Sequence, residues 1–103
     1  MYLLSYYVPS HAKETTKEAL FEIGAGMFEN YEKCAFETLG TGQFRPVRGA
    51  NPHIGTLEIL ERVEEYKVEI ICPDHLIAKA VATLKEAHPY EEVAYGVFKM
   101  EEF

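Results

Sequence analysis

Residues 7–11, Tyr-Val-Pro-Ser-His, and residues 71–75, Ile-Cys-Pro-Asp-His, decide the fold because they repeat one pattern. In each stretch an apolar strand end is followed by a proline, a polar residue suited to cap a helix, and a histidine. A strand that leads into a helix in this way is the first part of a βαβ unit. The repeat therefore predicts two similar βαβ halves within one chain.

The first half extends in both directions from Pro9. Residues 1–8 are apolar on both faces of the predicted strand, which indicates a central position in a sheet. After Ser10, the expected N-cap, apolar residues recur at helical spacing, and Gly24 is placed to end the helix in the left-handed conformation. The predicted buried stripe of this helix comprises Ala12, Thr16, Ala19, Leu20 and Ile23.

The second half repeats this order. Residues 65–72 form a predicted strand with Tyr66, Val68, Ile70 and Cys72 on one face. The helix that follows has the stripe Ile77, Ala80, Val81 and Leu84, and it ends at His88-Pro89 because a residue before proline avoids the helical region. A last strand is expected over residues 92–100, with Val93, Tyr95 and Val97 on one face.

The connection between the halves is the least regular part of the chain. Residues 31–38 alternate as a half-buried strand, and Gly40-Thr41-Gly42 is expected to break it before residues 43–45 resume an extended path. Residues 46–56 hold two prolines and two glycines and form a predicted loop, and residues 57–61 form a short extra strand. A loop this long in a compact domain usually serves function or an interface.

These elements predict an α+β, ferredoxin-like split βαβ fold (βαββαβ) as a single domain over residues 1–103. Right-handed crossovers place both helices on one face of a four-stranded antiparallel sheet. The other face carries Leu3, Tyr7 and Ile71 and is too apolar to be left in water. Self-association is therefore expected, as a trimer or a dimer.

Composition and charge exclude several classes of function. A net charge of -7 and a pI near 5.0 disfavour nucleic acid and anionic membranes as partners. No apolar run approaches the length of a membrane span, and the chain begins with strand-like residues rather than a signal peptide, so a cytoplasmic location is expected. Cys34 and Cys72 lie in strand-like segments and are expected to be small buried hydrophobes rather than disulfide partners or metal ligands.

Two motifs resemble a known family. The first, the glycine-arginine motif, is Gly-Thr-Gly-Gln-Phe-Arg-Pro over residues 40–46 with Gly-Ala-Asn-Pro-His-Ile-Gly over residues 49–55, and the second is His-Pro-Tyr-Glu-Glu over residues 88–92. Together they resemble the PII-like insert domain of the Nif-three-like proteins, and His-Pro-Tyr-Glu is also similar to CutA, a divalent-cation-tolerance protein. The resemblance implies a PII/CutA-like fold and a trimer-type homo-oligomer. It does not imply the dinuclear metal site of the Nif-three-like host domain, which has no counterpart in this sequence.

The motifs also supply candidate binding residues. Glycines allow backbone N–H groups to approach an anion and an arginine can hold phosphate or carboxylate, so the predicted ligand site comprises Gly40, Thr41, Gly42, Gln43, Arg45 and Asn51. A divalent metal ion is the second candidate ligand, with His88, Glu91 and His53 as its predicted ligands. The alternatives are a structural loop at a subunit interface, whose Arg45 pairs with a neighbouring carboxylate, and a His88 that stabilises the end of its helix as a cation.

Other polar residues are expected to be solvated. They are His11 and His75, which follow the two prolines, and the carboxylates Glu61, Glu64 and Glu65. The leading hypothesis is a non-enzymatic, oligomeric binding or regulatory module for a small ligand or divalent metal. A structural oligomerisation module and a small enzyme of the α+β-barrel type, with His53 or His88 as acid or base, remain the alternatives.

Overall fold

The computed structural model describes residues 1–103 and has the order βαββαβ. The strands are β1 (Tyr2–Pro9), β2 (Phe36–Phe44), β3 (Glu61–Cys72) and β4 (Tyr95–Lys99). The helices are α1 (Lys13–Glu22) and α2 (Ile77–Ala87), each preceded by a 3₁₀ turn, η1 (Ser10–Ala12) and η2 (Asp74–Leu76). The predicted split βαβ fold is confirmed.

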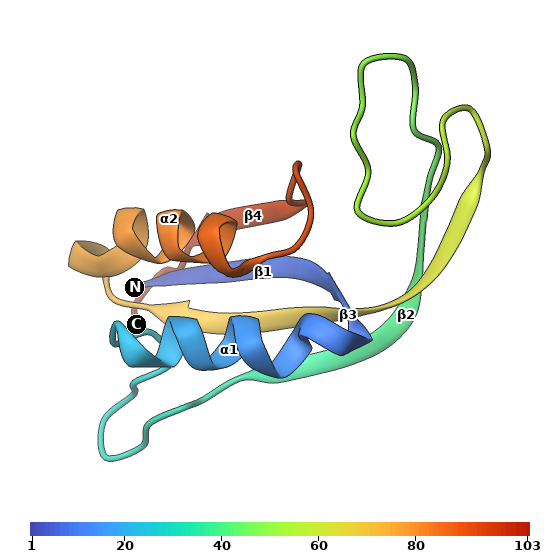
Figure 1. Ribbon diagram of the computed structural model, residues 1–103. Coiled ribbons are helices and arrows are strands. Elements are labelled where there is room, and N and C mark those ends of the chain that lie inside the picture. Colours follow the sequence, from blue (N-terminus) through green and yellow to red (C-terminus); the bar gives the residue numbers. More distant parts are fainter.

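The strands form one antiparallel sheet in the order β2-β3-β1-β4. Strand β1 lies between β3 and β4, so that Leu4 is opposite Ile70 on one side and Val97 on the other. This central position confirms what the apolar side chains on both faces of β1 predict. Figure 1 shows the two helices in front of these strands, at the same side of the sheet.

The core lies between the helices and one face of the sheet. The fully buried side chains of the sheet include Leu4, Tyr6 and Ile70, and those of the helices include Leu20 and Leu84. The buried Tyr6 hydroxyl is paired with the Thr16 hydroxyl at 2.9 Å, and Thr16 donates its own hydrogen to the Lys13 carbonyl. Because every buried hydroxyl here has a partner, these polar groups do not weaken the apolar core.

The ends of the helices agree only in part with the sequence. Gly24 ends α1 with a φ of 104°, as predicted, and a side chain there would collide with Leu76. Ser10 is not a capping residue, because its hydroxyl donates to Glu64 at 3.2 Å and η1 begins without a side-chain cap. Cys72 is buried in β3, whereas Cys34 lies half-buried in the loop before β2 rather than in a strand.

The largest difference concerns the connection between β2 and β3. Strand β2 begins at Phe36 and continues through Gly40 and Gly42 to Phe44, so the predicted break at Gly40-Thr41-Gly42 is wrong. The predicted extra strand over residues 57–61 is also absent, since only Glu61 is in a strand, at the start of β3. Glycine retains its backbone hydrogen-bonding groups, so pairing with β3 outweighs its weak preference for extended structure.

This continuation creates an arm, which we define as residues 40–65. Strand β1 pairs with β3 only as far as Pro9 and Glu65, so beyond that point β2 and β3 pair with each other alone. Figure 1 shows the arm curving away from the sheet and carrying the loop between its strands toward the end of α2. Neither helix of the chain has the length and apolar character needed to cross a membrane.

The packing predicts a strong effect of Leu84→Ala. The Leu84 side chain is fully buried between α2 and the sheet, so its truncation should lower the free energy of unfolding by about 2–5 kcal/mol. Lys79→Ala on the exposed side of the same helix is the control and should change it by no more than about 0.5 kcal/mol. Urea unfolding followed by circular dichroism measures both, and equal effects would contradict this placement of the core.

Candidate functional site

A groove of about 530 Å³ lies where the arm faces the chain after α2. Both motifs line it, although they are far apart in the sequence. Its lining residues are Tyr7, Gly42, Gln43, Phe44, Arg45, Pro46, Val47, Ala50, Pro52, His53, Ile54, Glu65, Tyr90, Glu91, Glu92 and Ala94. Concave, largely apolar surfaces with a few polar groups are the usual form of small-ligand sites. The groove is therefore the candidate site.

The two walls of the groove are joined across its edge. The backbone N–H of Asn51 donates to Glu91 Oε1 at 2.8 Å. The Tyr90 ring lies between the walls, with its centroid 6.3 Å from the Phe44 ring and 6.2 Å from the His53 ring. These contacts hold the loop of the arm against the segment that follows α2.

His88 fixes the position of the segment that follows α2. It is only 5% exposed, its Nε2 lies 2.7 Å from the Tyr7 carbonyl oxygen, and its Nδ1 accepts the Tyr90 N–H at 3.1 Å. A carbonyl can only accept and an amide N–H can only donate, so the ring is the neutral tautomer with hydrogen on Nε2. Burial lowers the pKa of His88 below its usual value, although the hydrogen bond to Tyr7 opposes this shift. His88 thus positions the segment as a neutral group rather than as a cation at the helix end.

Glu65 connects the two walls beneath the groove. The Tyr90 hydroxyl donates to Glu65 Oε2 at 3.0 Å, and burial together with this carboxylate raises the pKa of Tyr90. The Glu65 side chain lies directly over Gly42, where a Cβ atom would collide with its carboxyl group. Glu65 is therefore half-buried and hydrogen-bonded rather than solvated, and Gly42 provides the space for it.

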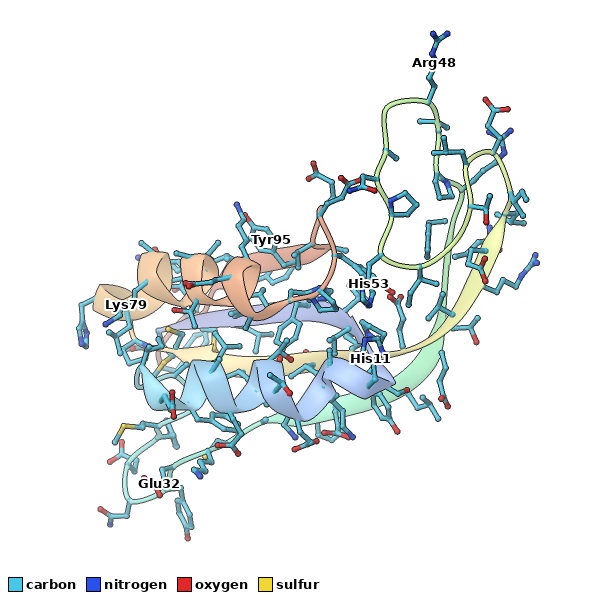
Figure 2. The ribbon with its side chains drawn as sticks, viewed as in Figure 1. His11, Glu32, Arg48, His53, Lys79 and Tyr95 are labelled. Atoms are coloured by element: carbon cyan, nitrogen blue, oxygen red, sulfur yellow. The ribbon has the colours of Figure 1, made fainter.

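The predicted ligand residues are divided between two places. Gly42, Gln43 and Arg45 line the groove, and Asn51 borders it through its backbone, whereas Gly40 and Thr41 line a neighbouring hollow with Lys67. Arg45 makes no hydrogen bond or ion pair within the chain, and the alternative of a subunit-interface loop with Arg45 paired to a carboxylate stays a prediction. Figure 2 shows Arg48 at the tip of the loop, pointing away from the groove.

The predicted metal ligands are differently disposed. Both nitrogens of His88 are hydrogen-bonded and one oxygen of Glu91 accepts from Asn51. The structure gathers no group of three or more His, Cys, Asp or Glu side chains that could hold a metal ion, so the set His88, Glu91 and His53 stays a prediction. His53 instead faces His11, with 3.3 Å between their Nε2 atoms, a pairing across 42 residues that the local sequence does not reveal.

The fold places the chain in the class of CutA-like and PII-like domains. The divalent cation tolerance protein CutA from Archaeoglobus fulgidus superposes with a TM-score of 0.71 at 15% identity, covering 100% of this chain and 87% of that one. At this identity the likeness concerns the fold alone. No protein-family model matches the chain.

The more similar relatives are NIF3-related proteins that are much longer than this chain. A Bacillus cereus protein related to NIF3 superposes with a TM-score of 0.84 at 39% identity, covering 98% of this chain and 26% of that one. The GTP cyclohydrolase 1 type 2 homolog of Mycobacterium tuberculosis is 42% identical over 94 residues, which are 91% of this chain and 25% of the relative. The chain is therefore homologous to one domain-sized part of the NIF3-related proteins and spans about a quarter of their length. In general terms, this homology supports a small binding or regulatory domain.

The neutral His88 predicts a pH dependence of stability. Because its pKa is lower in the folded chain than the ordinary value of 6.5, the unfolded chain binds more protons just below that pH. The contribution of His88 to the free energy of unfolding is complete above about pH 6.5 and is lost as the pH falls through the lowered pKa. His88→Gln should unfold more easily at pH 7.5 but lose less further stability between pH 6.5 and 5, as measured by thermal unfolding. Parallel pH profiles for the two proteins would argue against a neutral, buried His88.

Proposed function

We propose that the chain is a binding module that takes a small organic ligand with one anionic group in the groove. Arg45 is the counter-charge for that group. The proposal is carried by one observation, which is that Arg45 lines the groove and has no partner in the chain. An arginine held beside an apolar surface without a carboxylate partner is a ready site for a carboxylate or phosphate.

The other charges of the groove support this assignment. The carboxylates that line the groove are Glu65, Glu91 and Glu92, and none of them forms an ion pair with Arg45. The chain as a whole carries a net charge of -7, which repels polyanions. Together these charges favour a ligand with a single anionic group over a polyphosphate.

The apolar and aromatic lining of the groove indicates the chemistry of the uncharged part of the ligand. Phe44, Pro46, Val47 and Ile54 form an apolar side of the groove, and the Tyr90 and His53 rings provide flat surfaces. Aromatic rings favour offset or edge-to-face contacts with other rings. A small aromatic or aliphatic acid would therefore meet apolar walls with its body and Arg45 with its charge.

Arg45→Ala tests this proposal, with benzoate and inorganic phosphate as probes. Loss of a hydrogen bond to a charged group should weaken binding of the probe about tenfold or more. Arg48→Ala is the matched control, because that side chain points away from the groove and its loss should leave the affinity unchanged. Titration followed by NMR reports both the affinity and the backbone signals that move. Equal losses in the two variants, or no binding of either probe, would contradict the proposal.

A second function, self-association, is favoured by the uncovered face of the sheet. We propose that this face forms the interface of a homo-oligomer, for which the resemblance leads us to expect a trimer. Ile71, Leu3 and Phe98 are direct cross-strand neighbours on this face, and Phe98 is 58% exposed. Phe36, on the same face at the edge strand, is 68% exposed. Contiguous apolar surface of this kind is usually covered by another protein surface.

Phe98→Glu should shift the protein toward the monomer, because a carboxylate would have to be buried in the interface. Ala82→Glu, which adds the same charge at an exposed position of α2, should leave the subunit count unchanged. Native mass spectrometry measures the subunit count, and circular dichroism verifies that both variants are folded. A monomeric unsubstituted chain, or equal dissociation of both variants, would exclude this face as the interface.

A further inference from the structure

His11 and His53 approach each other from distant parts of the chain. His11 lies in η1 at the start of the first helical segment, and His53 lies in the loop of the arm. Their Nε2 atoms are 3.3 Å apart and their ring centroids 5.4 Å apart, so the rings meet by their Nε2 corners. Figure 2 shows the two side chains facing each other at the base of the arm. We infer that this pair binds a divalent transition-metal ion, with Nε2 of each histidine as a ligand.

The spacing suits two ligands of one ion as well as it suits a long hydrogen bond between the rings. The 3.3 Å between the two Nε2 atoms is slightly longer than the range of about 2.7–3.2 Å that is usual when an N–H donates to oxygen. Two imidazole nitrogens bound at about 2.0–2.1 Å to one tetrahedral Zn²⁺ lie about 3.3–3.4 Å apart. The Nε2 atoms of His11 and His53 thus lie at the separation that two ligands of a tetrahedral ion require.

The surroundings of the pair suit a cation. Both histidines are exposed, so an ion can reach them from solvent without a change in the core. The nearby His88 is neutral and adds no positive charge. Imidazole nitrogens are good ligands for Zn²⁺, Ni²⁺ and Cu²⁺ and poor ones for Mg²⁺ and Ca²⁺. The pair therefore selects for transition metals.

Two protein ligands leave the other coordination positions open. His53 also lines the groove, so an ion bound to this pair would lie beside the groove. The ion would also attach the loop of the arm to the body of the domain. The contact of Asn51 with Glu91 and the Nε2–Nε2 contact of His11 with His53 are the two polar links between residues 45–60 and the rest of the chain outside the arm. Metal binding would therefore stabilise the arm in the position that forms the groove.

The test is a titration of the full chain, first treated with chelator, with ZnCl₂ by calorimetry and with Co²⁺ by visible absorption. We expect one ion per chain and at least a tenfold weaker affinity in both His11→Ala and His53→Ala. His75→Ala is the matched control, because His75 occupies the equivalent position of the second half, is exposed and has no hydrogen-bonded partner. Its affinity for Zn²⁺ should equal that of the unsubstituted chain.

Three results would overturn the inference: no binding of Zn²⁺ or Co²⁺, unchanged affinity in the His11 and His53 variants, or an equal loss in His75→Ala. The side-chain nitrogen signals of His11 and His53 should also move in NMR spectra when Zn²⁺ is added, while those of His88 should stay. The inference does not depend on the proposed anion site. Arg45→Ala should retain Zn²⁺ binding, so failure of one proposal is distinguishable from failure of the other.

Discussion

The buried imidazole of His88 is the constraint on which the groove depends. It uses both nitrogens, one toward the Tyr7 carbonyl of the central strand and one toward the Tyr90 N–H. Leaving either backbone group unpaired in this buried position would cost on the order of 1–3 kcal/mol, so the chain after α2 has one favoured path. That path places Tyr90 against Glu65, and Glu65 in turn lies across Gly42. One neutral ring thereby links the central strand to the edge strand of the arm.

Much of the fold follows from patterns that are local in the sequence. The alternation of Leu4, Tyr6 and Val8 fixes which face of β1 meets the helices, and these three side chains are fully buried. The same holds for the stripe of α2, whose Ala80 and Leu84 are fully buried. Such patterns reveal the fold because burial follows the period of each element, which neighbouring residues already display.

The predictions made from the sequence fail where a contact with a distant residue determines the local structure. Gly40 and Gly42 are typical of a turn by composition, but both pair with residues of β3. The Glu65 side chain occupies the space that Gly42 leaves free. His11 is exposed, as the sequence predicts, but its contact with His53 depends on how the arm folds and is not visible in the local sequence. The two motifs meet at one groove, whereas Gly40 and Thr41 of the first motif lie apart from it in a neighbouring hollow.

The contrast between the two walls of the groove suggests how such a module could report a ligand. The wall formed by the segment after α2 is tied to the core through His88, whereas the loop of the arm is attached to the body by few hydrogen bonds and exposes Val47, Ile59 and Leu60. A weakly attached segment samples more than one position, and a ligand that contacts both walls stabilises the position that forms the groove. A ligand can shift the populations of these positions of the arm only by as much as its affinity for them differs. Because the arm carries exposed apolar side chains, the proposed ligand would also determine where this apolar surface lies relative to the rest of the domain.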